Sequence, residues 1–274
     1  MKVVKILLGL LFFVLISCDS QTIQGEPEVD IHTLENNFPE WYDYFYFNIT
    51  ASNDFIPVDE GSNRISKDKY FKELLTGDFI PIKLKMPDSS LYYKLFRINK
   101  DSKIGSSISA QIRSISEVDY RNFKMEGKEF PEFEFRDING VVYNSSGTKG
   151  KNLIIKCWFV NCVACIKEFP ELNALVERNH QNDDMEFISL VLDPAADLEE
   201  FLERRSLNYS NVPEQSKLIR EELGISEFPT HIVVGKDGKI EKVFKSAGAM
   251  IAYLNHQNYK RIKKPNEFAV PPPM

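Results

Sequence analysis

The sequence is poor in cysteine, in net positive charge and in long apolar runs, and each shortage excludes a class of protein. Four cysteines in 274 residues are too few for a small domain held together by disulfides. The 34 Lys and Arg are outnumbered by 40 Asp and Glu, which argues against nucleic acid as the main partner. With 43% apolar and 12% aromatic residues, the chain is too hydrophobic to be disordered. The composition therefore predicts a folded protein of one large domain or two ordinary ones.

The apolar run near the N-terminus, Ile6–Ile16, has eleven residues, about half of what a membrane-spanning helix needs. Lys2 and Lys5 precede it, as in a secretory signal peptide. It ends in Leu-Ile-Ser-Cys, which resembles the bacterial lipobox, where the cysteine is lipidated and becomes the new N-terminus. We therefore expect residues 1–17 to be a lipoprotein signal peptide and Cys18 a lipid anchor. The alternative is an ordinary secretory signal or an uncleaved anchor, with the cysteine there by chance.

The next part of the chain divides into a polar segment and an aromatic region. Residues 18–30 have almost no apolar pattern and are predicted to be a flexible tether. Residues 31–119 are predicted to form a small α+β or mostly-β accessory domain, whose role its sequence does not reveal. Within it we expect one helix and four strands by composition and turn signals: a helix over 66–76, and strands over 41–47, 79–85, 91–98 and 104–115.

Residues 120–264 alternate between strand and helix patterns, which predicts an α/β domain. Residues 265–274 are Pro-rich at their end and are predicted to be a loose tail. The expected elements of the domain are buried strands over 153–160 and 185–192, helices over 165–179, 198–205, 214–223 and 247–262, and hairpins over 133–144 and 232–244.

A C-x-x-C motif, Cys162 to Cys165, lies between a predicted buried strand and the start of a helix. At the N-terminus of a helix, unpaired N–H groups and the helix dipole favour a thiolate and lower the pKa of the first cysteine. The second cysteine lies one turn further on, near enough for a reversible disulfide. The motif therefore predicts disulfide exchange, with Cys162 as the nucleophile and Cys165 as the resolving thiol.

Three other interpretations of the motif stay open. A zinc site needs four ligands, but only Cys157 is near, and no second C-x-x-C or His pair follows at ligand spacing, so no metal is expected. A purely structural disulfide is disfavoured, because so short a loop adds little stability. The third interpretation is that two buried cysteines lie next to each other by chance.

Several residues around the motif recur at fixed spacing in one known family. From Gly127 to about Leu254 the chain resembles the thioredoxin-fold domain of the TlpA/ResA-like exported thiol–disulfide oxidoreductases. The matching features are the lead-in GKEFPEF at 127–133, Trp158 four residues before Cys162, Glu168 and Pro170 after Cys165, Phe228-Pro229-Thr230, and the turn at 236–240.

The resemblance implies roles for some of these residues. Pro229 would be a cis-proline that places the main chain of Phe228 beside the disulfide, where it can bind an extended substrate strand; the alternative is a trans proline entering a strand. Glu168 would be a partly buried carboxylate that moves protons at the resolving thiol, or else a solvated helix residue. Trp158 would be the family's strand tryptophan.

The sequence also departs from the family pattern. Cys157 stands where a large apolar side chain is usual, and we expect a buried, inert thiol there. Asn161 replaces an aromatic residue, and Val163-Ala164 replaces a proline-containing pair, so the redox potential does not carry over. Lys156 stands where thioredoxins hold a buried acid, and pairing with Glu168 is expected. His231 is expected to be structural.

The sequence thus predicts a membrane-anchored thiol–disulfide oxidoreductase, without a cofactor, that faces the periplasm of a bacterial cell envelope. Its expected partners are thiols or disulfides of exported proteins, a membrane electron donor or acceptor, and the membrane through the lipid anchor, but not nucleic acid. One alternative is a surface lipoprotein that binds a partner through its N-terminal domain, with the thioredoxin-like domain as a scaffold. A peroxidase of the peroxiredoxin type is disfavoured, because Ile155 and Phe159 stand where its motif needs proline and threonine.

Overall fold

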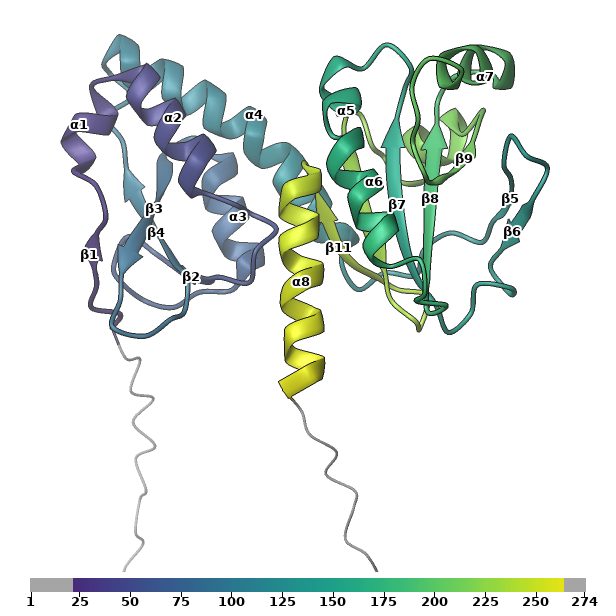
Figure 1. The fold of residues 1–274 in the computed structure, drawn as a ribbon. Coiled ribbons are helices and arrows are strands. Elements are labelled where there is room, and N and C mark those ends of the chain that lie inside the picture. The colour runs from purple at the N-terminus through teal and green to yellow at the C-terminus, as the bar shows by residue number, and fades with distance from the viewer. Residues whose placement is uncertain (1–21, 264–274) are drawn as a thin grey trace, which may run out of the picture.

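The computed structural model describes residues 22–263. The predicted signal peptide, Cys18 and the predicted tail 265–274 lie outside this range. Two separate sheets, each with helices of its own, form an N-terminal and a C-terminal domain (Figure 1). Between residues 22 and 263, no helix combines the length and the apolar character that crossing a bilayer requires.

The N-terminal domain is α+β, with a four-stranded sheet in the order β1-β3-β4-β2. Its core is largely aromatic and joins the sheet to the helices. The strands are β1 (Glu26–Pro27), β2 (Ile56–Val58), β3 (Phe79–Lys85) and β4 (Tyr92–Arg97), and the helices are α1 (Ile31–Glu35), α2 (Phe38–Asn48), α3 (Lys67–Leu75) and α4 (Lys103–Met125). The predicted helix over 66–76 and the strands over 79–85 and 91–98 are confirmed.

The strand predicted over 41–47 is wrong, since these residues lie within helix α2. The side chain of Asn37 caps the helix by accepting a hydrogen bond from the Glu40 N–H, and Pro39 occupies the first turn. Trp41 and Phe45, four residues apart, are the buried residues of the helix. Helical spacing of two buried rings therefore prevails over the strand preference of an aromatic run.

The strand predicted over 104–115 is also wrong, because it lies within the 23-residue helix α4. Ser102 caps this helix by accepting a hydrogen bond from the Gly105 N–H at 2.9 Å, and Ile108 and Ile112 are buried on one face. The helix continues through residue 119, the predicted end of the N-terminal domain. The predicted tether 18–30 is also shorter than expected, since β1 pairs with β3.

The C-terminal domain has a five-stranded sheet in the order β11-β10-β7-β8-β9, with β5 and β6 as a separate hairpin. Strands β7, β8 and β9 are parallel, whereas β10 is antiparallel to β7 and β11. The strands are β5 (Glu134–Arg136), β6 (Val142–Asn144), β7 (Asn152–Trp158), β8 (Met185–Val191), β9 (Ser210–Val212), β10 (Thr230–Val234) and β11 (Ile240–Phe244). The helical segments are α5 (Val163–Lys167), α6 (Phe169–Arg178), α7 (Ala195–Leu202), a π-helical turn η1 (Leu218–Glu222) and α8 (Ala247–Lys263).

Both hairpins, the two buried strands and the last helix agree with the predictions. The single helix expected over 165–179 is instead two helices, α5 and α6, which meet at Glu168. Pro170 explains the break, because proline has no N–H to donate and its ring clashes with the carbonyl four residues earlier. The helix expected over 198–205 begins and ends three residues earlier, and that over 214–223 is reduced to η1.

Alternate residues of the central strand β7 face two different cores, one on each side of the sheet. Ile154 and Trp158 belong to the core under α6, α7 and α8, and this core also contains Cys162 and Cys165. Ile155 and Cys157 belong to the core on the opposite face. Since successive side chains of a strand point to opposite faces, the third cysteine of the region is turned away from the other two.

Candidate active site

Cys162 and Cys165 form a disulfide at the turn between β7 and α5, with their Cα atoms 5.2 Å apart. Cys162 is the N-cap residue of α5, and its sulfur accepts a hydrogen bond from the Cys165 N–H at 3.2 Å. Cys165 is completely buried, Cys162 is 5% exposed, and the intervening Val163 is 67% exposed. Of the two cysteines, only Cys162 has exposed surface, which is consistent with the predicted nucleophile.

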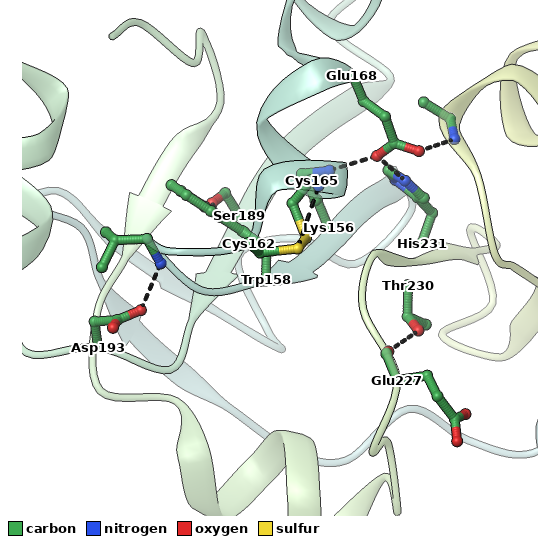
Figure 2. Close-up of a disulfide and its surroundings, with 12 residues drawn as sticks. Lys156, Trp158, Cys162, Cys165, Glu168, Ser189, Asp193, Glu227, Thr230 and His231 are labelled. Carbon is green, nitrogen blue, oxygen red and sulfur yellow. Dashed lines mark hydrogen bonds and ion pairs between the residues drawn. A yellow bond between two sulfur atoms is a disulfide. The ribbon is translucent and has the colours of Figure 1, made fainter. Parts of the chain in front are cut away.

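Two contacts from strand β8 and the loop after it hold the turn that carries the cysteines (Figure 2). The Val160 N–H donates a hydrogen bond to the Asp193 carboxylate at 2.8 Å. Trp158, fully buried, donates its indole N–H to the Ser189 hydroxyl at 2.6 Å. Trp158 also packs edge-on against Phe169 of α6. The strand tryptophan thus links β7, β8 and α6 directly beneath the disulfide turn.

A polar cluster lies behind the disulfide, centred on the carboxylate of Glu168 (Figure 2). One carboxylate oxygen accepts hydrogen bonds from Lys156 Nζ at 2.7 Å and His231 Nε2 at 2.9 Å. The other oxygen accepts a hydrogen bond from the Ala247 N–H at 2.8 Å. Lys156 and His231 stand opposite each other on β7 and β10, and both side chains are fully buried. The predicted pairing of Lys156 with Glu168 is confirmed.

The charges of this cluster balance with one cation and one anion. Burial alone raises the pKa of Glu168, but the hydrogen bond from His231 and the charge of Lys156 outweigh it and bring the pKa below its ordinary value. Burial lowers the pKa of Lys156, and the charge of Glu168 opposes this. Burial also lowers the pKa of His231, whose Nδ1 has no partner among the described residues. A neutral ring protonated at Nε2 leaves no buried donor unpaired, so Lys156 carries the charge that balances Glu168.

The loop before β10 contains the predicted cis-proline, because the Phe228–Pro229 peptide bond is cis. Phe228 packs against the core that contains both cysteines, edge-on to Phe159. The hydroxyl of Thr230 donates to the Glu227 carbonyl at 2.7 Å and so closes the loop (Figure 2). Phe228 also packs against the core on the opposite face, so the loop lies at the edge between the two cores.

Cys157 is separated from this chemistry. It is fully buried as a free thiol in the core on the opposite face of the sheet. Burial raises its pKa to about 12. A thiol that is neither ionised nor accessible at neutral pH is a poor nucleophile, which agrees with the expected inert role.

A cavity of about 460 Å³ lies between the domains rather than at the disulfide, lined by residues of α2, α4, β11 and the start of α8. Among residues 22–263, no group of three or more His, Cys, Asp or Glu side chains is arranged to hold a metal ion. The disulfide is therefore not in this cavity: it lies in the turn before α5, where Val163 is exposed and Cys162 is 5% exposed.

The structure brings together most of the predicted site residues and adds others. Cys162, Cys165, Trp158 and Phe228 share one core, and Glu168 lies in the polar cluster behind it. The contacts missed by sequence reasoning are Asp193, Ser189, the Ala247 N–H and the direct bond from His231 to Glu168. Of these, Asp193 could have been predicted from the sequence. It follows a buried strand, β8, that is parallel to β7, and the carboxyl ends of parallel strands lie at the same edge of a sheet.

The fold and the disulfide site together define the class of protein. A mixed sheet with helices on both faces presents a cysteine pair before a helix and a cis-proline loop before a neighbouring strand. This is the thioredoxin fold, and its reactive group is a disulfide that can be opened and closed. The protein is a thioredoxin-fold thiol–disulfide oxidoreductase.

Comparison with known proteins finds relatives of this domain. Residues 127–243 match the model of the AhpC/TSA family. The thiol-disulfide oxidoreductase ResA of Geobacillus thermodenitrificans is 27% identical over 151 residues, covering 53% of this chain and 85% of the relative. ResA of Bacillus subtilis is 27% identical over 143 residues, covering 52% of this chain and 78% of the relative.

Two solved structures are also similar. The thioredoxin domain of a thiol-disulfide oxidoreductase from Bacteroides vulgatus is 21% identical, with a TM-score of 0.44, and the match covers 48% of this chain and 96% of that domain. An exposed lipoprotein thioredoxin from Streptococcus pneumoniae is 23% identical, with a TM-score of 0.41, and the match covers 46% of this chain and 99% of that structure.

Proposed function

We propose that this protein is a lipid-anchored oxidoreductase of the bacterial cell envelope that exchanges disulfides with exported proteins. The observation that carries the proposal is the position of Cys162, which caps α5 at a surface turn with its partner Cys165 buried behind it. The cis-proline loop supplies a main chain to which an extended substrate can hydrogen-bond. The site therefore suits a polypeptide that carries a disulfide or a pair of thiols.

The exchange proceeds in two balanced steps. In the reduced protein the thiolate of Cys162 attacks one sulfur of a substrate disulfide, forms a mixed disulfide, and releases the other substrate sulfur as a thiolate. The thiolate of Cys165 then attacks the sulfur of Cys162, which forms the Cys162–Cys165 disulfide and releases the second substrate thiolate. Two electrons pass from the protein to the substrate, and the reverse sequence oxidises a substrate dithiol.

Glu168 follows Cys165 by three residues, and we propose that it assists proton transfer at the Cys165 thiol. Its carboxylate is held by three donors, so its position relative to the α5 turn is fixed. An anion near a thiol opposes formation of the thiolate and can accept the proton that the thiol loses. This role predicts that Glu168→Gln changes the pH dependence of the second exchange step more than that of the first.

The membrane anchor is proposed from the sequence alone. The charged start, the apolar run of eleven residues and the Leu-Ile-Ser-Cys sequence support lipidation at Cys18. Acyl chains on this cysteine would hold the protein at a membrane with both domains in the periplasm. There the expected partners are exported proteins and a membrane protein that supplies or removes electrons.

Trapping with Cys165→Ser in the full chain tests the exchange. Without a resolving thiol, the mixed disulfide at Cys162 should accumulate, and non-reducing gels should show adducts that disappear on reduction. The matched control is the double variant Cys162→Ser/Cys165→Ser, which should form none. If Cys165→Ser forms no more adducts than the double variant while Cys162 is reduced, the proposed exchange is wrong.

Fractionation with Cys18→Ser tests the anchor separately. The wild-type protein should remain with membranes in high salt and leave them in detergent, whereas Cys18→Ser should be released without detergent. An unchanged distribution would contradict lipid anchoring but leave the exchange chemistry untouched.

A further inference from the structure

The N-terminal domain reaches the cis-proline loop through one arginine. Arg121 lies on α4, and its guanidinium donates to the Ser226 hydroxyl at 3.1 Å and to the Glu227 carboxylate at 2.6 Å. These are the second and third residues before the cis-proline, Pro229. A side chain of one domain thus holds two consecutive residues of the loop that borders the disulfide in the other.

Phe228 is held by its packing against both cores of the C-terminal domain, but Ser226 and Glu227 before it have few other contacts. The start of the loop is held by the bond from the Ile225 N–H to the Ile219 carbonyl, and its end by the hydroxyl of Thr230 on the Glu227 carbonyl. Between these points, the side chains of Ser226 and Glu227 are hydrogen-bonded to Arg121 and to each other. Arg121 therefore supplies the external support of the middle of the loop.

The helix that carries Arg121 is itself fixed against the C-terminal sheet. Asp119 forms an ion pair of 2.5 Å with Lys245, and Glu126 one of 3.1 Å with Lys242. Asp119 and Lys242 are both buried. The two pairs lie on either side of Arg121 along α4, so they hold the helix while the guanidinium reaches the loop. Figure 1 shows α4 crossing from the N-terminal domain to the edge of the other sheet.

We propose that Arg121 is a positioning residue for substrate binding, and that α4 makes the N-terminal domain part of the substrate-recognition device. This inference rests on the proposed function, in which the cis-proline loop binds the substrate main chain. A loop held in one conformation binds an extended peptide without first losing its own freedom. The support should matter for a peptide disulfide but not for a small disulfide, which does not extend along the loop.

The test compares Arg121→Ala with Arg113→Ala in the full chain. Arg113 lies on the same helix, is exposed, and has no charged or hydrogen-bonding side-chain partner among the described residues, so both variants lose the same charge. For a peptide disulfide, Arg121→Ala should raise KM about five- to tenfold and leave kcat within about twofold, as loss of a charge-assisted hydrogen bond predicts. Turnover of a small disulfide such as cystine should not change.

Hydrogen exchange gives a readout that does not depend on activity. The amide of Ile225, which donates to the Ile219 carbonyl, should exchange about tenfold faster in Arg121→Ala but not in Arg113→Ala. Glu227→Gln, a change at a half-exposed side chain, should give a smaller effect in the same direction and serves if Arg121→Ala does not fold. The charge exchange Arg121→Glu/Glu227→Arg should restore part of the protection.

The outcomes separate the two proposals. If the wild-type protein does not exchange with a peptide disulfide, the proposed function fails, and hydrogen exchange alone then decides whether Arg121 supports the loop. If the wild type exchanges but Arg121→Ala matches Arg113→Ala in KM and in loop protection, the positioning role is wrong.

Discussion

The two domains fill their interiors with different chemistry. The N-terminal core is built from apolar and aromatic side chains, among them Trp41, Phe71 and Tyr93. The C-terminal domain instead buries Lys156 and His231 completely, beside Glu168. Burying charges is costly unless they are paired and hydrogen-bonded, so a fold does not gain stability from such a cluster over an apolar core. The C-terminal domain thus holds a charged pair beside the core of the disulfide, whereas the buried polar residues of the N-terminal domain, such as Asp119, lie on α4 where it meets the other domain.

The largest expected effect on stability comes from removing the charge of Glu168. Glu168→Gln removes the anion and leaves Lys156 buried without a counter-charge, which should lower the free energy of unfolding by about 3–5 kcal/mol. Urea unfolding of the oxidised protein measures this. Glu171→Gln, the same change at an exposed site on α6, should cost under about 0.5 kcal/mol.

A double variant that also removes the charge of Lys156 tests the reason for this loss of stability. In Lys156→Met/Glu168→Gln no charge is left unpaired, and the double variant should be more stable than Glu168→Gln alone. If it is no more stable than Glu168→Gln, the loss in that variant does not come from an uncompensated Lys156, and if it is much less stable than the wild type, the pair contributes net stability.

Acid should affect the two interiors differently. The folded-state pKa of Glu168 lies below the ordinary value, so its contribution to stability is present above about pH 4.3 and is lost as the pH falls through the lower, folded-state pKa. We expect a loss of about 1–3 kcal/mol over this range in the wild-type protein, and a flatter dependence in Glu168→Gln.

A core variant of the N-terminal domain is the control for the acid experiment. Trp41→Ala should lower stability by about 3–5 kcal/mol, because it leaves a large cavity. Its slope against pH should nevertheless equal that of the wild type, since Trp41 does not titrate. Equal slopes in wild type and Glu168→Gln would contradict the assignment of acid sensitivity to the charged cluster.

A smaller effect is expected at the start of α4. Ser102→Ala removes the side chain that accepts the Gly105 N–H, and should cost about 1 kcal/mol. Ser107→Ala, within the same helix and exposed, should cost less. Amide exchange should quicken in the first turn of α4 and remain unchanged around the disulfide; a faster exchange at residues 162–165 would show that the two domains open together.

The smallest expected effect is at Cys157. In the reduced native protein at pH 8, iodoacetamide should modify Cys162 and leave Cys157 unmodified, because burial raises the pKa of Cys157 to about 12. Peptide mass mapping measures the two sites, and labelling in denaturant is the control. Modification of Cys157 at a rate similar to that of Cys162 would mean that both faces of the sheet are reactive.

The cysteine pair before a helix could be predicted from residue types at fixed spacing. The cis-proline and the pairing of Lys156 with Glu168 were expected from the family resemblance, and the structure confirms both. The contact of His231 with Glu168 could not be predicted, because it depends on the register of β10 against β7. Such a register joins residues about 75 positions apart, and no local pattern encodes it.

The failures in the N-terminal domain have one physical cause. The segments over 41–47 and 104–115 are rich in strand-favouring residues, yet their buried side chains recur every four residues, as in Ile108 and Ile112. The period of burial is set by the core, and the core overrides intrinsic preference. Attention to the caps Asn37 and Ser102 would have corrected both predictions.

The segment after α4 has a consequence for assembly. Gly127 and Lys128 exchange backbone hydrogen bonds with Ile240, at the start of the edge strand β11, and Phe130 donates to the Gly238 carbonyl. Together with α4, this segment occupies the rim where a foreign strand could otherwise add. The opposite rim is β9, only three residues long. The two rims of the C-terminal sheet thus leave little open strand to which another polypeptide chain could add and aggregate.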